Sequence, residues 1–418
     1  MFIIKKNCEK IMKYKPLRSL YYQNKDEYKN EYEKRVNSPA TVFFDIKING
    51  NMGFIVADWE VVSLIETIGR NNAEAAEIFC ALPGVAQEYY KRKCLIDEIQ
   101  TTNDIEGIHS TRKEIKDALG ADETGKRLTR FQGIAKKYEK LLQTSPQNLP
   151  LKTCADIRNL YDEIVSREID PDEQPDGIIF RNKTVFVFSP TQQKRHEGVN
   201  PEKKIIETME EALRILEARD LPILIRIAVF HYFFGFIHPF YDGNGRMSRF
   251  ISSYLLKENS FPLLALDLSH TIKEHKKAYY DAFRICNDKK NMGDVTPFAI
   301  TFLEFLEMSS ARMKENLREG AHRLERLREV IDKKLGKDDK QRERKGKLLF
   351  LLLQNALFAL EPFSMQELQH YMGCSRTTLE KLISALTDEG FPVITDKKTR
   401  PHGYTLDPDR LDEASEEG

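Results

Sequence analysis

Residues 221–240 form the most apolar stretch of the chain and limit most strongly what it can fold into. The stretch approaches the length of a membrane-spanning helix, but it contains Pro222, Arg226 and His231, and charged side chains are costly in lipid. A helix that is apolar on all sides and stays in water has to be buried in a protein core. We therefore expect a buried central helix from about Pro222 to Ile237, and no membrane segment.

Composition and charge narrow the class of protein. The 418 residues exceed a typical domain, and 41% hydrophobic with 31% charged residues is usual for folded chains, so we expect two or three domains. Lys plus Arg and Asp plus Glu both number 65, so the whole chain carries no positive field that would attract nucleic acid. The six cysteines are scattered without a CxxC pair, which favours reduced thiols and a cytoplasmic location over disulfides or zinc.

Most of the chain shows helical periodicity, which indicates a mainly α fold. Apolar residues recur at helical spacing from Asp58 on, after a strand expected at residues 40–48. A helix over residues 89–106 should stop at Gly107, because glycine is the residue that most often follows a helix end. Two β-rich pieces, residues 177–180 and 184–188, are separated by three residues, which predicts a short hairpin.

The central helix leads into residues 238–249, which read His-Pro-Phe-Tyr-Asp-Gly-Asn-Gly-Arg-Met-Ser-Arg. Gly243, Asn244 and Gly245 belong to a tight turn, and Arg246 begins the next helix. Free backbone N–H groups at a helix start, beside glycines that allow close approach, form a cradle for anions. We expect this turn to bind the phosphates of a nucleotide.

Four side chains around the turn supply the other functional groups. Arg246 and Arg249 lie three residues apart on one helix face, where guanidinium groups can grip phosphate oxygens. Asp242 next to phosphates suits a ligand of Mg²⁺. His238, with an ordinary pKa of about 6.5, can take a proton from a Ser, Thr or Tyr hydroxyl. Phe240, which alternates with His238, should point into the core.

These residues resemble the signature of the Fic family, His-x-Phe-x-Asp/Glu-Gly-Asn-Gly/Lys-Arg-x-x-Arg, at every specified position. The resemblance implies transfer of AMP from ATP to a protein hydroxyl with release of pyrophosphate, with His238 as the base. The phosphate-transferring Doc branch has Lys where this chain has Gly245, which favours AMP as the transferred group. Transfer of UMP or phosphocholine stays open, as does a plain glycine-rich turn beside a core histidine.

Two more segments extend the resemblance. Tyr279 and Tyr280, followed by Asn287, resemble the nucleotide pocket of AMP-transferring members, although either tyrosine could be an ordinary core residue. The predicted hairpin resembles the family's flap, whose edge pairs with the target segment by strand addition, although such a hairpin can also just cover a core. The expected flap edge consists of Val185, Phe186, Val187 and Phe188.

A segment before the signature resembles the family's inhibitory pattern, Ser/Thr-x-x-x-Glu-Gly/Asn. It contains Thr102 and Glu106, four residues apart on one helix face, followed by Gly107. The resemblance implies that Glu106 pairs with Arg249 and occupies the guanidinium that should hold the γ-phosphate. In some relatives the same glutamate orients the water that removes AMP, so the reverse reaction stays open.

The C-terminal part has the pattern of a winged helix-turn-helix. An apolar helix from Leu348 is followed by a helix that Ser364 caps, a helix from Ser375 and two strand-like pieces. Contact with DNA is chemically possible, but Glu380 lies on the outward face and the basic excess is modest. Protein docking or dimerisation is the other interpretation, so DNA and a second copy of the chain both stay open as partners.

The sequence therefore predicts a mainly α protein in four parts. These are an N-terminal region with the inhibitory helix (1–125), a Fic-type helical core with a β-hairpin flap (126–332), a charged linker (333–347) and a winged-helix domain (348–410). The predicted function is adenylyltransfer, with ATP and Mg²⁺, to a Ser, Thr or Tyr hydroxyl of a target protein or of the chain itself. The rival is a DNA-binding regulator that only senses nucleotide, which would not need the base His238.

Overall fold

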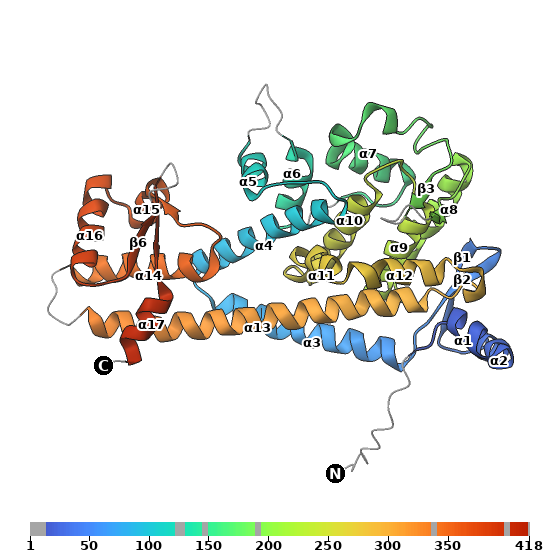
Figure 1. The fold of residues 1–418 in the computed structure, drawn as a ribbon, viewed down its shortest axis with the longest axis horizontal. Coiled ribbons are helices and arrows are strands. Elements are labelled where there is room, and N and C mark those ends of the chain that lie inside the picture. Colours follow the sequence, from blue (N-terminus) through green and yellow to red (C-terminus); the bar gives the residue numbers. More distant parts are fainter. Residues whose placement is uncertain are drawn as a thin grey trace, which may run out of the picture. The chain divides into compact units, whose positions relative to one another are not determined.

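The computed structural model describes residues 14–121, 130–143, 149–188, 194–335, 341–396 and 402–416. Within these residues the chain is mostly helical, with small antiparallel sheets (Figure 1), so the predicted mainly α class is confirmed. The chain divides into two compact units, residues 1–71 with 96–311 and residues 72–95 with 312–418. The four parts expected from the sequence stay predictions, and residues 336–340 of the expected linker lie outside the described residues.

The first unit consists of helices around a central helix, with two hairpins. Its N-terminal half contains α1 (Leu17–Gln23), α2 (Lys25–Val36), β1 (Thr41–Ile48), β2 (Asn51–Val56), the first part of α3 (Trp59–Ala81), the last part of α4 (Gly84–Ile105), α5 (Arg112–Gly120), α6 (Gln132–Lys140), α7 (Cys154–Ile164), η1 (Ser166–Glu168) and η2 (Pro171–Glu173). Its second half contains β3 (Phe186–Phe188), β4 (Lys194–Glu197), α8 (Glu202–Glu217), α9 (Ile223–Ile237), α10 (Asn244–Glu258), η3 (Leu264–Leu266), α11 (Leu268–Glu274), α12 (Lys276–Cys286), η4 (Lys289–Asn291) and the first part of α13 (Thr296–Lys334).

Helix α9 is the predicted central helix. Every residue from 227 to 234 is buried, because α8, α10 and the aromatic side chains of α12 and α13 surround it. Its polar side chain His231 is buried with both ring nitrogens hydrogen-bonded. In the part of the chain that the structure describes, no helix has both the length and the apolar character needed to cross a membrane.

The predicted hairpin between residues 177–180 and 184–188 is wrong in its first strand. Residues 177–180 form a bend, because the Glu202 carboxylate accepts hydrogen bonds from the N–H groups of Ile178, Ile179 and Phe180. Those N–H groups are then not available to a partner strand. The actual hairpin pairs β3 with β4 in antiparallel register, with Val187 opposite His196. Three of the four expected flap residues form β3, and Val185 directly precedes it.

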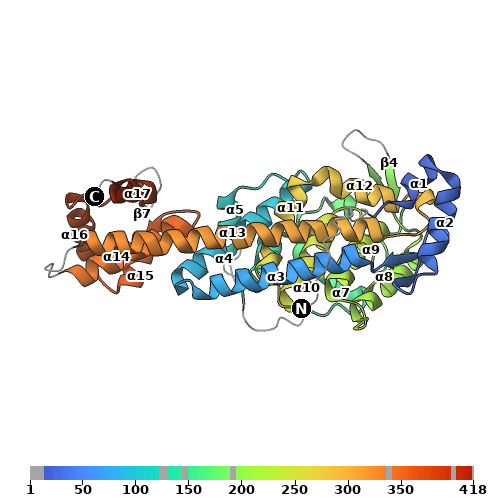
Figure 2. The same ribbon diagram turned by 90° about the horizontal axis from the view of Figure 1, so that it is seen from below.

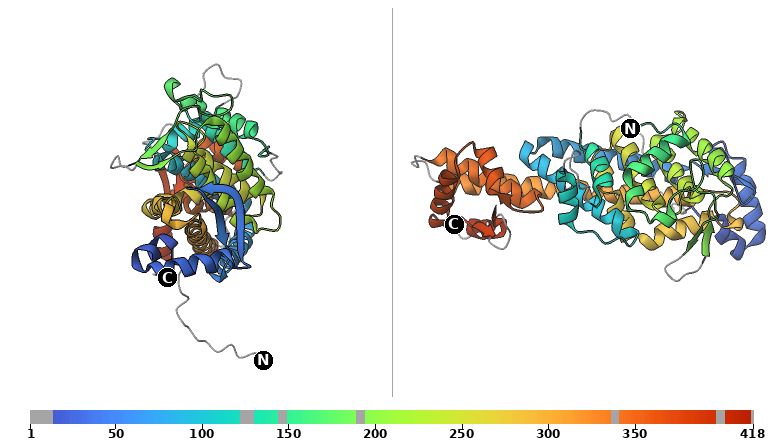
Figure 3. Two further views of the ribbon diagram at one scale, coloured as in Figure 1. Left: turned by 90° about the vertical axis from the view of Figure 1, so that its right-hand side faces the viewer. Right: turned by 90° about the horizontal axis from the view of Figure 1, so that it is seen from above.

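The N-terminal helices close one end of the first unit. In Figure 3 (left) the dark-blue α1 and α2 lie against the gold segment that contains η4, where Arg18 Nε donates to Asp288 at 2.6 Å. Asp294 is fully buried and accepts from Arg35 Nη1 at 2.9 Å. Helices α3 and α13 run side by side (Figure 2), and Asn71 Nδ2 donates to Ser310 Oγ at 3.4 Å. Residues 14–55 therefore belong structurally to the unit that holds the signature loop.

The second unit combines parts of α3, α4 and α13 with a small α/β module. The module contains α14 (Arg342–Phe358), β5 (Phe363–Ser364), α15 (Met365–Met372), α16 (Arg376–Asp388), β6 (Val393–Asp396), β7 (Gly403–Leu406) and α17 (Pro408–Glu416). Its sheet has the order β5-β7-β6. Ser364 caps α15 as expected, in a capping box with Glu367, and Gly373 ends that helix. The winged-helix assignment itself stays a prediction, and residues 397–401 of its expected wing lie outside the described residues.

Candidate active site

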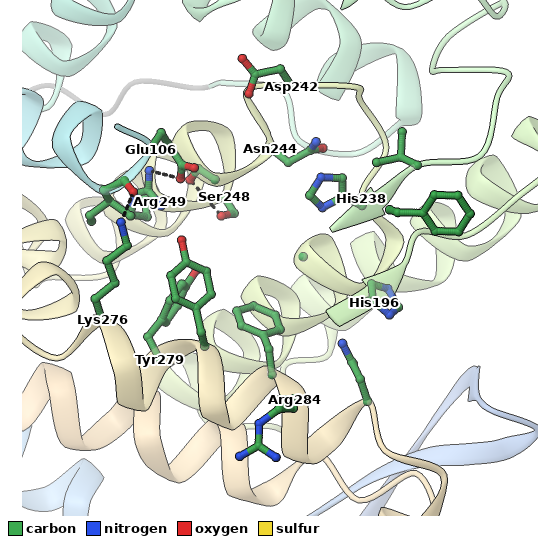
Figure 4. Close-up of a pocket in the computed structure, with 18 of the residues that line it drawn as sticks. Glu106, His196, His238, Asp242, Asn244, Ser248, Arg249, Lys276, Tyr279 and Arg284 are labelled. Carbon is green, nitrogen blue, oxygen red and sulfur yellow. Dashed lines mark hydrogen bonds and ion pairs between the residues drawn. The ribbon is translucent and has the colours of Figure 1, made fainter. Parts of the chain in front are cut away.

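A cavity of about 430 Å³ lies where the loop between α9 and α10 faces α12, the β3–β4 hairpin and the end of α4 (Figure 4). This volume is in the range of sites for small ligands. Most of the residues singled out from the sequence line it. They are Glu106, Val185, Phe186, His238, Asp242, Asn244, Gly245, Arg249, Tyr279, Tyr280 and Asn287.

His238 caps the C-terminus of α9 in a left-handed conformation, with φ 52° and ψ 63°. This backbone turn directs its ring into the cavity (Figure 4). Burial, together with the positive charges of His196 and Arg181, lowers the pKa of His238 to about 4. The imidazole is therefore neutral near pH 7 and has a lone pair that can accept a proton.

The turn after His238 is held by its own side chains. Asn244 Nδ2 donates to Phe240 O at 2.8 Å, and Asn244 Oδ1 accepts from Phe240 N–H at 3.0 Å. The Asn244 amide thus closes the turn, so its contribution at the cavity comes through the backbone. Phe240 is fully buried, as expected, and stacks on Tyr161 with ring centroids 3.8 Å apart. Gly243 has φ +83°, a conformation that favours glycine.

The two arginines of the signature point to different places. Arg249 lines the main cavity, whereas Arg246 lines a second cavity on the other side of Asp242. Arg246 is 1% exposed, and its Nη1 donates to Glu168 at 2.8 Å. The expectation that both guanidinium groups face one anion is therefore not met here, because Glu168 of η1 holds one of them. Phosphate contact by Arg246 stays a prediction.

Arg249 is occupied by Thr102 in the last turn of α4 and by Glu106, which directly follows that helix. Its Nη2 donates to Glu106 Oε1 at 2.7 Å and to the Thr102 carbonyl at 3.0 Å, and its Nε donates to Thr102 Oγ1 at 2.7 Å. Burial by itself lowers the pKa of Arg249, but the Glu106 carboxylate raises it above its usual value. A Cβ at Gly245 would overlap Glu106 Oε1, so a side chain at this position would displace the Glu106 carboxylate from its place beside Arg249. The pairing inferred from the inhibitory pattern is thus present in the structure.

Helix α4 is fastened near Glu106 by contacts that the sequence did not reveal. Lys276 Nζ donates to Ile105 O at 2.6 Å, and Ser269 donates from both its N–H and its hydroxyl to the buried Glu98. Burial raises the pKa of Glu98 to about 7 despite these hydrogen bonds. Neither contact follows from local sequence, because each partner lies more than 150 residues away along the chain.

The expected nucleotide-pocket residues lie along α12, with part of their polar capacity already used. Tyr279 hydroxyl is 2.8 Å from His231 Nε2, and Asn287 Oδ1 accepts from Tyr232 hydroxyl at 2.7 Å. Tyr280 is less buried than Tyr279 and also lines the cavity. Their contact with an adenine ring stays a prediction.

A magnesium ion would depend on Asp242 and the nucleotide together. Among the residues that the structure describes, no group of three or more His, Cys, Asp or Glu side chains converges on a metal position. Mg²⁺ in phosphate-transfer sites is typically held by one or two carboxylates plus substrate phosphates. A single aspartate on the cavity rim fits that donor set, so Asp242 is the residue that would hold the ion.

A model of the Fic/DOC family matches residues 151–256, which contain the β3–β4 hairpin, α9 and the whole loop 238–249. Residues 151–256 of this chain thus form a Fic domain. Protein adenylyltransferase Fic of Aedes aegypti is 38% identical over 71 residues, 17% of this chain and 12% of that protein. Its counterpart in Drosophila grimshawi is 28% identical over 146 residues, 35% of this chain and 27% of that protein. The chain thus aligns with less than a third of the length of these curated relatives.

A solved Fic family protein from Desulfovibrio desulfuricans is 21% identical, and the alignment covers 82% of this chain and 96% of that one at a TM-score of 0.46. The family match begins at residue 151 and ends at residue 256. The residues outside this match include Thr102 of α4, Glu106 directly after α4, and Tyr279 and Tyr280 of α12. Any role proposed for them therefore rests on the structure: Glu106, Tyr279 and Tyr280 line the cavity, and Thr102 contacts Arg249.

Proposed function

We propose that this Fic protein transfers AMP from ATP to the hydroxyl of a Ser, Thr or Tyr residue, on a target protein or on itself. One observation carries the proposal. His238, Arg249 and the N-terminus of α10 converge on one cavity, which also touches the β3–β4 hairpin. A base, an anion site and a surface for a protein substrate are what the reaction requires. The adenylyltransferase names of the relatives support the same activity.

In the proposed reaction the neutral His238 takes the proton from the target hydroxyl. The hydroxyl oxygen forms a bond to the α-phosphorus, and the bond from that phosphorus to the bridging oxygen of pyrophosphate breaks. The N–H groups at the start of α10 bind the phosphate oxygens, because a helix N-terminus favours negative charge. Mg²⁺ held by Asp242 would neutralise charge on the phosphates.

The β3–β4 hairpin is proposed to dock the target. Val185 and the half-exposed Phe186 line the cavity beside His238. A target segment that pairs with the edge of β3 would carry its hydroxyl toward the base, since main-chain pairing fixes the position of alternate side chains. The side chains of Val187 and Phe188 are outside the described part.

Glu106 is proposed to act as an intramolecular brake. Its carboxylate holds the Nη2 group of Arg249 at 2.7 Å, and that guanidinium faces the cavity in which ATP would lie. While the pair persists, the γ-phosphate loses its cationic partner, so ATP would bind without the geometry needed for attack at the α-phosphorus.

The test incubates wild type, Glu106→Gly and Glu106→Gly/His238→Ala with Mg²⁺ and ATP labelled at the α- or at the γ-phosphate, in cell lysate. AMP transfer predicts protein label from the α-position only, and only with Glu106→Gly. Mass spectrometry of the labelled bands then identifies the modified residue. Label from the γ-position, or label that persists without His238, would contradict the proposal.

Removal of AMP is a second candidate, because the Glu106 carboxylate lies on the same cavity as His238. A carboxylate there can orient a water for attack on an AMP-modified residue. The test adds wild-type protein to a target that Glu106→Gly has labelled. Loss of label that requires Glu106 would favour this reaction, whereas stable label would exclude it.

The second unit is proposed to dock protein, including a second copy of the chain, in preference to DNA. On the exposed face of α16, Arg376 Nε pairs with Glu380 at 2.8 Å, so the positive charge of Arg376, which a DNA phosphate would need, is already neutralised. Light scattering and DNA gel shifts at varied salt would separate the two. The described cysteines are free thiols, which fits the proposed cytoplasmic location.

A further inference from the structure

Arg181 is a fully buried cation beside the catalytic loop. Within the described residues no carboxylate pairs with it, and its hydrogen bonds all go to backbone carbonyls. The acceptors are His238 O at 2.8 Å from Nε, Lys183 O at 2.6 Å from Nη1, and Val199 O and Ile237 O at 2.8 and 3.4 Å from Nη2. Burying a charge without a counter-ion is costly. A buried cation that satisfies only carbonyls therefore calls for a specific role.

The four carbonyls belong to the base of the β3–β4 hairpin and to the backbone at His238. The proposed reaction needs a fixed distance between these two parts. Lys183 lies shortly before β3 and Val199 lies shortly after β4, so both belong to the open base of the hairpin. Ile237 is the last residue of α9, and His238 follows it in the left-handed conformation. Two backbone hydrogen bonds run in parallel, from Arg181 N–H to Pro239 O at 3.2 Å and from Val199 N–H to Ile237 O at 3.1 Å. One side chain thus joins the base of the hairpin to the main chain of the catalytic histidine.

The conformation of His238 makes such a support necessary. A left-handed backbone is unfavourable for residues other than glycine, and it persists when the surroundings over-determine it. Arg181 donates to the carbonyls of Ile237 and His238, which lie directly before and after the Cα atom of His238. Gly198 leaves the room for this arrangement, because a Cβ there would lie 3.2 Å from His238 Cβ and would overlap Arg181 Nη2.

We propose that Arg181 is a positioning residue that locks the base of the target-docking hairpin to the backbone of His238. The distance between the docked hydroxyl and the base is then set by one rigid junction. Arg181 does not line the main cavity, so it acts through His238 and does not contact the nucleotide. The inference rests on the proposed function, because it assigns His238 the role of base.

The charge of Arg181 adds a second, measurable effect. Three charged or titratable groups influence the pKa of His238. His196 of β4 and Arg181 lower it, and Glu106, directly after α4, raises it. Removing the guanidinium should therefore raise the pKa of His238. A lysine at this position keeps the charge, but its single ammonium group cannot reach four separate carbonyls.

The test compares Arg181→Met and Arg181→Lys, each with Glu106→Gly in the full chain. Arg226→Met is the matched control, because Arg226 is also an arginine that donates to a backbone carbonyl, Leu216 O, but it lies near the start of α9, far from the loop that follows that helix. We expect Arg181→Met to lower kcat at least about tenfold at unchanged KM for ATP, because small misplacements of reacting groups have large effects on rate. Arg181→Lys should lower kcat while the pKa of His238, followed by NMR of labelled histidine, stays low. Arg226→Met should change neither.

Hydrogen exchange tests the contact between the hairpin and the His238 loop independently of activity. Hydrogen exchange of the Val199 amide should speed up in Arg181→Met and not in Arg226→Met. Gly198→Ala, which displaces Arg181 without removing its charge, should reproduce the loss of kcat if Arg181→Met fails to fold. Unchanged kcat and exchange in folded Arg181→Met, or ATP affinity that falls together with kcat, would overturn the proposal. If Glu106→Gly itself transfers no AMP, the proposed function fails, while exchange and the pKa of His238 still test the junction.

Discussion

The effect of Glu106→Gly on the rate of AMP transfer can be calculated from the contact between Glu106 and Arg249 that it removes. The Arg249 side chain is 1% exposed and that of Glu106 is 26% exposed, and their hydrogen bond is 2.7 Å long. A hydrogen bond to a charged group contributes about 1.5–3 kcal/mol. ATP that places its γ-phosphate on Arg249 has to displace this bond, so the productive pose is disfavoured by a comparable free energy.

Each 1.4 kcal/mol corresponds to about a factor of ten in population. Removing Glu106 should therefore raise the initial rate of AMP transfer by about 10- to 100-fold at saturating ATP. The partial exposure of Glu106 places the expected value toward the lower end, because solvent weakens the pair in the folded state. The rate is measured as α-phosphate label incorporated into protein over time.

Asp104→Gly is the matched control, because it puts glycine into the last turn of α4, two residues before Glu106, and removes an ion pair with Lys273 that does not involve Arg249. Glycine in a helix costs about 1 kcal/mol, so this control loosens the end of α4 at least as much as Glu106→Gly does. A gain in rate that Asp104→Gly shares would mean that loosening α4, and not freeing Arg249, is what activates. A folded Glu106→Gly that binds ATP and transfers AMP no faster than wild type would refute the brake.

Three further predictions concern Thr102, Phe240 and the pH dependence of His238. Thr102→Val removes the hydroxyl that accepts from Arg249 Nε at 2.7 Å, which should lower the free energy of unfolding by about 1–3 kcal/mol in urea denaturation. Phe240→Ala empties the fully buried position that stacks on Tyr161, and its expected cost is about 3–5 kcal/mol by the same method. The low pKa of His238, about 4, predicts that kcat/KM of Glu106→Gly is flat around neutral pH and falls only as the pH drops toward that value, whereas a break near pH 6.5 would contradict it. Because this pKa is lowered in the folded state, the neutral ring's contribution to stability is complete above about pH 6.5 and is lost as the pH falls through 4.

Much of the fold could be predicted because its strongest signals are local. Helix α9 is apolar on every side, so its burial followed from composition alone. The Ser364 capping box and the Gly373 helix end depend on residues that are neighbours in sequence. Thr102 and Glu106 share one face of α4 by helical spacing, and both do reach Arg249.

The mistakes arose where a distant side chain decides the local structure. Residues 177–180 have the composition of a strand, but Glu202 takes their N–H groups. The ion pair of Arg246 with Glu168 and its place at a second cavity were likewise not visible in the sequence, and its contact with phosphate stays a prediction. Arg181 appeared to be a turn residue, and nothing in its neighbourhood in sequence indicated that the carbonyls of His238 and Val199 would enclose it. Such partners are separated by many residues, so local patterns do not reveal them.

The two residues of the inhibitory pattern, Thr102 and Glu106, hold Arg249 in different ways. Thr102 is fully buried and holds Arg249 through both its hydroxyl and its carbonyl, whereas Glu106 is partly exposed and makes one hydrogen bond. When Glu106 turns away, Arg249 therefore keeps its orientation toward the cavity and does not need to be reordered for ATP. Release of the proposed brake would then require a change of one side chain directly after α4, not unfolding of that helix. It follows that Thr102 aligns the arginine in both states, so that Thr102→Val should fail to raise AMP transfer even though it removes a contact of the same pair.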